Sequence, residues 1–116
     1  MNNRDAASIW DMVQAIHRIQ EFTANLPFEN YVESLLVQSA VERQFMILGE
    51  AARRISDEFR QVHPEIAWRR IIGLRNVLTH RYDAVRQERV WTIITSELND
   101  LLLQLEPLLP PLPDDR

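Results

Sequence analysis

Apolar side chains return every three or four positions along most of this chain, which is the period of one face of an α-helix. Over residues 5–23 the repeat consists of Ile9, Met12, Val13, Ile16, Ile19 and Phe22. We therefore expect a first helix there. Pro27 should end it, because proline cannot donate a hydrogen bond to the preceding turn. A short helical piece is expected around residues 31–36.

A second long helix is predicted up to His63 and Pro64. Its apolar positions step by 4, 3, 4, 3 and 4, through Val41, Phe45, Leu48, Ala52, Ile55 and Phe59. Gly49 lies in the middle of this helix, where glycine costs stability relative to alanine. We interpret Gly49 as a point of close contact with a neighbouring helix.

Two further helices complete the pattern. One should run from about Ile66 towards Thr79, and the last from a cap at Asp83 to Leu105, where Pro107 stops it. The chain is thus predicted to be an all-α, up-and-down bundle of four to five helices. We expect one domain over residues 1–106 and an extended or disordered tail over residues 107–116.

Composition supports this helical prediction and excludes some kinds of site. The 116 residues include only two glycines and no cysteine, so disulfides and thiolate metal sites are excluded. No glycine-rich phosphate loop is present. We see no secretory or membrane-spanning run, and expect a soluble, cytoplasmic protein with no membrane contact.

The net charge of −4 hides an uneven distribution. Nine of the thirteen basic residues, all of them arginine, lie within residues 53–89 beside five acids. That window therefore carries +4, and the rest of the chain −8. The arginines are either a surface for a polyanion or ordinary decoration of exposed helix faces.

The stretch RNVLTHRY, residues 75–82, gathers side chains suited to phosphate chemistry. His80 can take or give a proton near neutral pH, and Arg75 can bind phosphate. Asn76 could hold the imidazole or a base edge, and Tyr82 brings a phenol. The alternative is structural: a histidine that interacts with a helix dipole, a solvated Arg-Asn pair and a buried tyrosine ring.

Arg75 and His80 are five residues apart, so roughly 140° separates them on an ideal helix. One straight helix would not point both at a single phosphate. Either the helix ends before His80 or a second chain completes the site. His17 and His63 are weaker candidates because neither has a carboxylate at ligand spacing, and Glu50 is expected to pair structurally with Arg53 or Arg54.

Three stretches resemble the HEPN superfamily of small helical proteins, and within it the HepT-like toxins. AVERQFMILGEAARRI is similar to the family's Gly-Glu-Ala helix, and PEIAWRRIIGLRN to its Pro and Trp approach to the site. RNVLTHRY fits its motif of Arg, four residues, His, one residue and Tyr, with Asn after the Arg. Trp91 fits the aromatic residue of the last helix.

The resemblance implies the toxin of a type II/VII-like toxin-antitoxin pair. It would be a homodimeric endoribonuclease that needs no metal or cofactor and cleaves RNA through attack by a 2′-hydroxyl. His80 would be the general base, Arg75 would stabilise the phosphorane, and Asn76 would position one of them. Thr79 and Arg81 would support the site.

The same resemblance implies regulation by a partner. A cognate minimal nucleotidyltransferase antitoxin would attach AMP to Tyr82, and the nearby Arg81 and Arg86 could receive its phosphates. The alternative is a non-catalytic helical dimer that binds a nucleotidyltransferase partner or a nucleotide.

Overall fold

The computed structural model describes residues 1–79 and 84–110, and this part of the chain is helical without any strand. The helices are α1 (Asn3–Thr23), α2 (Phe28–Glu33), α3 (Leu35–Arg53), α4 (Asp57–Val62), α5 (Trp68–Ile72), α6 (Leu74–Leu78), α7 (Ala84–Ser96) and α8 (Leu98–Leu105). A short 3₁₀ turn, η1, covers Glu106–Leu108. The prediction of an all-α fold is confirmed.

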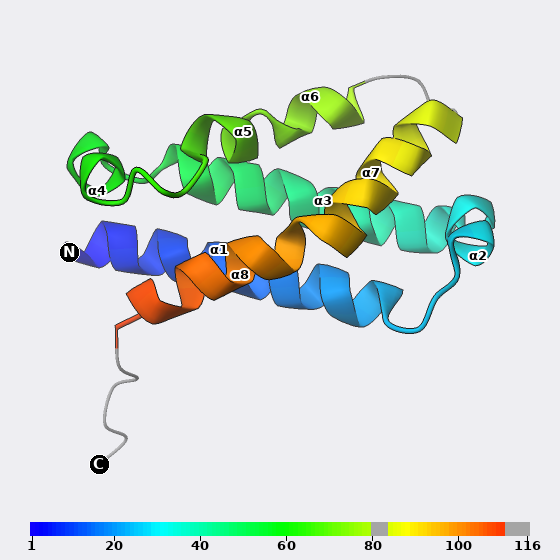
Figure 1. Ribbon diagram of the computed structural model, residues 1–116, viewed down its shortest axis with the longest axis horizontal. Coiled ribbons are helices and arrows are strands. Elements are labelled where there is room, and N and C mark those ends of the chain that lie inside the picture. The colour runs from blue at the N-terminus through cyan, green and yellow to red at the C-terminus, as the bar shows by residue number, and fades with distance from the viewer. Residues whose placement is uncertain (80–83, 111–116) are drawn as a thin grey trace, which may run out of the picture.

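The long elements alternate in direction, as in an up-and-down bundle (Figure 1). α1 and α3 lie antiparallel and side by side along most of their lengths. α5 and α6 return along one side of α3, and α7 and α8 then run back, with α8 against α1. The described part of the predicted RNVLTHRY motif, residues 75–79, therefore lies in α6 and its cap.

The core follows the predicted apolar seams of α1 and α3. Its fully buried members include Ile9, Met12, Ile16, Ile19, Val41, Phe45 and Leu48. The assignment of Phe22 to this seam is wrong, because its side chain is 39% exposed. Thr23, four residues after Ile19, takes the inward position and its hydroxyl donates to the Ile19 carbonyl at 2.8 Å.

The second long helix ends ten residues before His63, at Arg53, and not at His63 as predicted. The cause lies in a contact with α1. The buried carboxylate of Asp5 accepts hydrogen bonds from the backbone nitrogen of Ser56 at 2.9 Å and from its hydroxyl at 2.7 Å. The Ser56 hydroxyl also caps α4 by accepting from the Phe59 nitrogen. This capped turn separates α3 from α4.

Gly49 marks a close crossing of α3 and α5, as predicted. A Cβ atom added at Gly49 would lie 3.3 Å from the carbonyl oxygen of Ile71 and 3.6 Å from that of Ile72. The close approach brings the start of α6 against the same face of α3. Gly73 divides the predicted third helix into α5 and α6, and Glu97 divides the last helix into α7 and α8.

Candidate functional site

The described part of the motif is carried by the short helix α6. Leu74 is buried and Val77 and Leu78 are packed against the core, which fixes the inward face of this helix. Arg75 and Asn76 occupy the remaining face and are both exposed. The apolar residues of the motif therefore anchor α6, and its two polar residues are left free to meet a ligand.

α6 ends at Leu78, with Thr79 as its cap. The Thr79 hydroxyl donates to the Asn76 carbonyl at 2.8 Å, and the Thr79 nitrogen reaches the same oxygen at 3.4 Å. The spacing of Arg75 and His80 left two alternatives open. The structure agrees with the first of them, in which the helix ends before His80. His80, Arg81 and Tyr82 lie outside the described residues, as does the expected cap at Asp83.

Arg75 faces a hollow of about 320 Å³ between α3 and α6. Four arginines and a single acid line it, and we call it the arginine hollow: Arg43, Glu50, Arg53, Arg54 and Arg75. Arg53 pairs with Glu50 at 2.6 Å, as predicted. The hydrogen bond from Arg53 lowers the pKa of the Glu50 carboxyl, and the charges of Arg53, Arg54 and Arg75 lower this pKa further.

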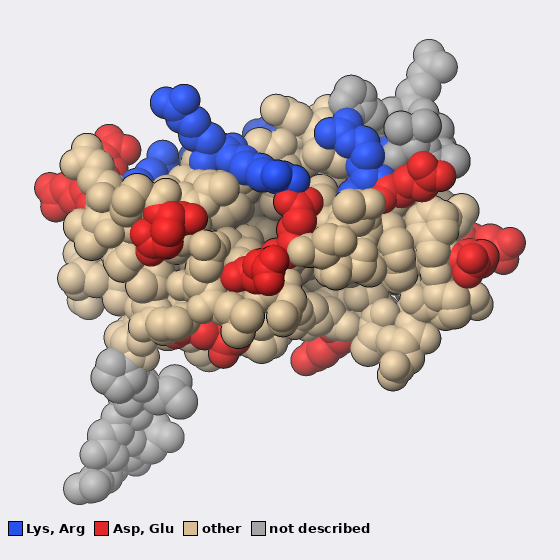
Figure 2. All heavy atoms as spheres, in the orientation of Figure 1, with Lys and Arg blue, Asp and Glu red and all other residues tan. Residues whose placement is uncertain are grey.

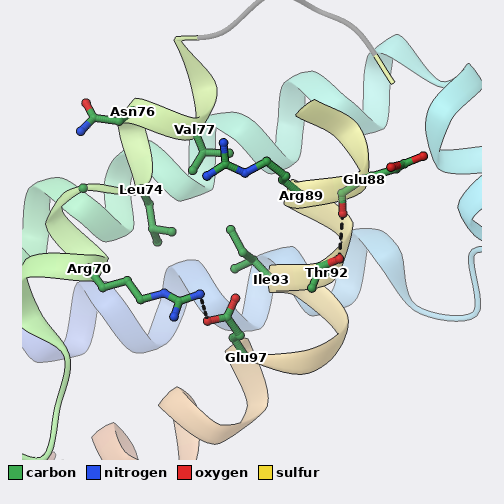
Figure 3. A pocket seen from close by; sticks show the side chains of 10 residues that line it. Arg70, Leu74, Asn76, Val77, Glu88, Arg89, Thr92, Ile93 and Glu97 are labelled. Atoms are coloured by element: carbon green, nitrogen blue, oxygen red, sulfur yellow. Dashed lines mark hydrogen bonds and ion pairs between the residues drawn. The ribbon is translucent and has the colours of Figure 1, made fainter. Parts of the chain in front are cut away.

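Asn76, the next residue, lines a different and larger hollow. This groove, of about 620 Å³, lies between α6 and α7 and we call it the α6–α7 groove (Figure 3). Leu74, Val77 and Ile93 form its apolar part. Arg70 and Glu97 pair across its far end, and Arg89 extends from α7 toward Val77. The sequence analysis did not single out this groove.

A buried polar cluster holds α7 on α3, and the sequence analysis missed it. Glu42 and Arg86 form an ion pair although their residues are only 7% and 4% exposed. The Gln87 side chain donates to Gln38 at 3.3 Å. The detectable signal was the spacing of Gln38 and Glu42, two polar residues four apart beside the apolar seam of α3.

This cluster corrects one expectation. Arg86 was expected to receive a phosphate near Tyr82, but it is buried and paired with Glu42, so it is not presented to an incoming nucleotide. Burial lowers the pKa of its guanidinium. Arg86 instead fixes the first turns of α7, directly after the motif.

Trp91 lies in the next turns of α7 and packs on α2. Its ring centroid is 5.0 Å from that of Tyr31 and 5.9 Å from that of Phe28. Burial raises the pKa of Tyr31 to about 12, against a weaker opposing effect of the Arg86 charge. The aromatic residue noted in the last helix thus forms part of the packing that orients α7.

The side chain of His63 makes packing and polar contacts near the end of α4. Its ring lies 4.6 Å from that of Phe59, and its Nδ1 is 3.2 Å from a Glu65 carboxylate oxygen. Over residues 1–79 and 84–110, no group of three or more histidine, aspartate or glutamate side chains could hold a metal ion. In the same ranges no helix is long and apolar enough to cross a membrane.

Charge on the surface follows the division seen in the sequence. Arginine side chains gather along the edge formed by α5, α6 and the start of α7, whereas acidic side chains are spread over the rest of this face (Figure 2). The edge includes Arg70 and Arg89, which line the α6–α7 groove. The described part of the motif, on α6, thus lies along this basic edge.

Comparison with known proteins confirms the family resemblance noted in the sequence. A family model described as "Ribonuclease HepT-like" matches residues 12–108. A Thermococcus cleftensis protein named "Probable ribonuclease HepT" is 35% identical over 98 residues, covering 84% of this chain and 89% of that protein. A candidate RNase of Methanocaldococcus jannaschii is 29% identical over 107 residues, covering 91% and 98% of the two chains. No solved structure matches significantly.

Proposed function

Because the chain belongs to the HepT-like ribonuclease family, we propose that it is the toxin of a toxin-antitoxin pair and that it cleaves RNA without a metal ion. The observation that carries this proposal is the exposure of Arg75 and Asn76 on α6, which ends two residues before His80. Because α6 ends before His80, the separation of roughly 140° on an ideal helix does not apply to Arg75 and His80. Thr79 supports this end of the site through its hydrogen bond to Asn76.

The proposed reaction needs one base and one cation. His80 takes the proton of the RNA 2′-hydroxyl, whose oxygen attacks the adjacent phosphorus. The guanidinium of Arg75 stabilises the charge that grows on the phosphorane oxygens. The bond between phosphorus and the 5′-oxygen then breaks, and that oxygen takes up a proton from water. The products are a 2′,3′-cyclic phosphate and a 5′-hydroxyl, and Asn76 positions the reacting groups.

The active form is proposed to be a homodimer in which two motifs face one another across a cleft. A two-fold axis would place the same surface of each copy at the contact. Arg75 and Asn76 line hollows on different sides of α6, so one copy does not direct both side chains into a single cavity. Light scattering at micromolar concentration should give the mass of a dimer, and a monomer would contradict the shared cleft.

Regulation is proposed to act on Tyr82. The phenol oxygen attacks the α-phosphorus of ATP on the cognate nucleotidyltransferase, pyrophosphate leaves and the phenol proton is released. The attached AMP adds negative charge and bulk beside Arg75 and Arg81, so it competes with the RNA phosphate. With Arg86 paired to Glu42, Arg81 is the remaining arginine of those expected to receive this phosphate.

Growth on induction tests the toxin proposal in cells. The wild-type chain should arrest growth, and His80→Ala and Arg75→Ala should not, at equal protein levels. Co-expressed nucleotidyltransferase should restore growth of the wild-type strain. If both alanine variants arrest growth as the wild type does, the non-catalytic partner-binding role becomes the better account.

Intact-mass analysis after co-expression tests the modification. Wild-type protein should gain the mass of one or more AMP groups, and Tyr82→Phe should gain none. An unmodified wild-type protein that is still neutralised would instead indicate inhibition by complex formation.

A further inference from the structure

The arginine hollow between α3 and α6 carries more net positive charge than the α6–α7 groove, where two arginines face two glutamates. Four arginines line the arginine hollow against one glutamate, an excess of three positive charges. The arginines come from two helices: three from α3 or its cap at Arg54, and Arg75 from α6. This convergence is a property of the fold, because Arg54 and Arg75 are far apart in sequence.

The crossing at Gly49 creates the convergence. With only a hydrogen atom on Gly49, the carbonyl of Ile71 approaches to 3.3 Å from where a Cβ atom would be. α5, and α6 directly after it, therefore pack close to α3. Ile47 and Ile72 form part of the floor, and Met46, which is 49% exposed, lies beside them. The result is an apolar floor with guanidinium groups around it.

The charges of the hollow are only partly compensated from within the chain. Arg53 pairs with Glu50 at 2.6 Å, and Arg54 reaches Asp11 on α1 at 3.8 Å. Over residues 1–79 and 84–110, no ion pair involves Arg43 or Arg75. A bound anion would therefore meet two guanidinium groups, those of Arg43 and Arg75, that form no ion pair within the described residues, with two more beside it.

We infer that the arginine hollow is a second phosphate subsite, which holds the RNA strand at a phosphate next to the scissile one. Planar guanidinium groups bind phosphate oxygens in pairs, and an apolar floor suits the face of a ribose or base. Arg75 is common to the hollow and to the proposed reaction, so one strand can pass from the scissile phosphate into the hollow. This inference rests on the proposed ribonuclease function, and names where its substrate is held.

Glu50 allows a test in which the expected change in RNA affinity has the opposite direction. It is the single acid of the hollow, and it lies close enough to Arg53, Arg54 and Arg75 for their charges to lower its pKa. A phosphate in the hollow would be repelled by this carboxylate. Removing its charge should therefore strengthen RNA binding, whereas removing an arginine should weaken it.

The experiment measures binding apart from cleavage. The probe is a fluorescein-labelled single-stranded RNA in which every 2′-hydroxyl is methylated, so attack by that oxygen is blocked. Fluorescence anisotropy is recorded with the full chain from about 50 to 200 mM salt, a range over which phosphate contacts change affinity strongly. The variants are Arg43→Gln/Arg53→Gln and Glu50→Gln. Arg18→Gln, an exposed arginine of α1 outside the hollow, is the matched control.

Arg43→Gln/Arg53→Gln should weaken binding at least about tenfold, and its salt dependence should fall by about 0.7 in log–log slope per lost phosphate contact. Glu50→Gln should strengthen binding about threefold, since it removes one exposed like charge. Arg18→Gln should match the wild type. Circular dichroism and light scattering should show that all variants keep the fold and oligomeric state of the wild type.

Several results would overturn the inference. They are wild-type affinity in the double variant, weaker binding in Glu50→Gln, or no measurable affinity in the wild type. A double variant that loses the wild-type oligomeric state would assign this face to contact between copies. One that binds RNA normally but loses the nucleotidyltransferase would assign it to the partner. If the wild type binds the methylated RNA as expected but cleaves no unmodified RNA, the proposed function fails and the subsite stands.

Discussion

Arg75 and Asn76 are adjacent in the chain, yet they line different hollows on different sides of α6. Arg75 joins the arginines of α3, whereas Asn76 lies with Arg89 and Glu88 of α7. The arrangement follows from α6 itself, because successive residues on a helix point about 100° apart. A strand of RNA that touches both residues must therefore cross the exposed ridge of α6.

The buried pair of Glu42 and Arg86 should matter more for stability than any exposed pair. We predict that Glu42→Gln lowers the free energy of unfolding by about 3 kcal/mol, because it removes the buried carboxylate that pairs with Arg86. Glu50→Gln, which removes the exposed partner of Arg53, should leave the urea midpoint unchanged. Equal midpoints for Glu42→Gln and the wild type would contradict this role.

A double replacement separates the cost of breaking the buried ion pair from the cost of lost packing. Glu42→Leu combined with Arg86→Met removes both charges at similar volume, and should recover much of the stability lost in Glu42→Gln. Urea unfolding monitored by circular dichroism measures all three variants on one scale.

Gly49→Ala should destabilise the fold by about 1 kcal/mol, although alanine favours a helix. The added methyl group would lie 3.3 Å from the Ile71 carbonyl, so α5 must move away from α3. Thermal unfolding of Gly49→Ala measures the effect. A rise in melting temperature would show that α5 moves away from α3 without loss of stability, and would contradict the close crossing.

The titration of Tyr31 provides a test of the α2–α7 contact. In the folded protein burial raises its pKa to about 12, from an ordinary value of 10. The folded state thus holds this proton more tightly, so its contribution to stability is complete below pH 10 and is lost as pH rises towards 12.

The chain has two tyrosines, so Tyr82→Phe isolates Tyr31 for absorbance titration at alkaline pH. The folded variant should ionise near pH 12, and the same variant in urea near pH 10. Ionisation near pH 10 in the folded variant would mean that the Tyr31 hydroxyl is reached by water.

The sequence predicted those parts of the fold that depend on local pattern. The seams of α1 and α3, the end of α1 before Pro27 and the contact at Gly49 follow from periodicity, proline and glycine. The end of α3 at Arg53 could not be predicted in this way. It depends on Asp5, which meets Ser56 only after α1 has packed beside α3.

The candidate site shows the same difference between features set by local sequence and contacts between separate helices. The motif of residues 75–82 is local, so it could be put forward as a candidate site from sequence alone. The pairing of Glu42 with Arg86 and the gathering of Arg43 with Arg75 join separate helices, and no local pattern specifies them. Arg86 was misassigned for this reason: its position near Tyr82 was visible, whereas its buried partner on α3 was not.

Cleavage of a defined RNA in the presence of a chelator tests the central claim most directly. Wild-type protein with EDTA should cut unmodified RNA, leave a 2′,3′-cyclic phosphate and a 5′-hydroxyl, and leave 2′-O-methylated RNA intact. His80→Ala and Arg75→Ala should each lower the rate at least about 100-fold while keeping the wild-type circular dichroism spectrum. Loss of wild-type activity with EDTA, or wild-type rates in either alanine variant, would contradict the account.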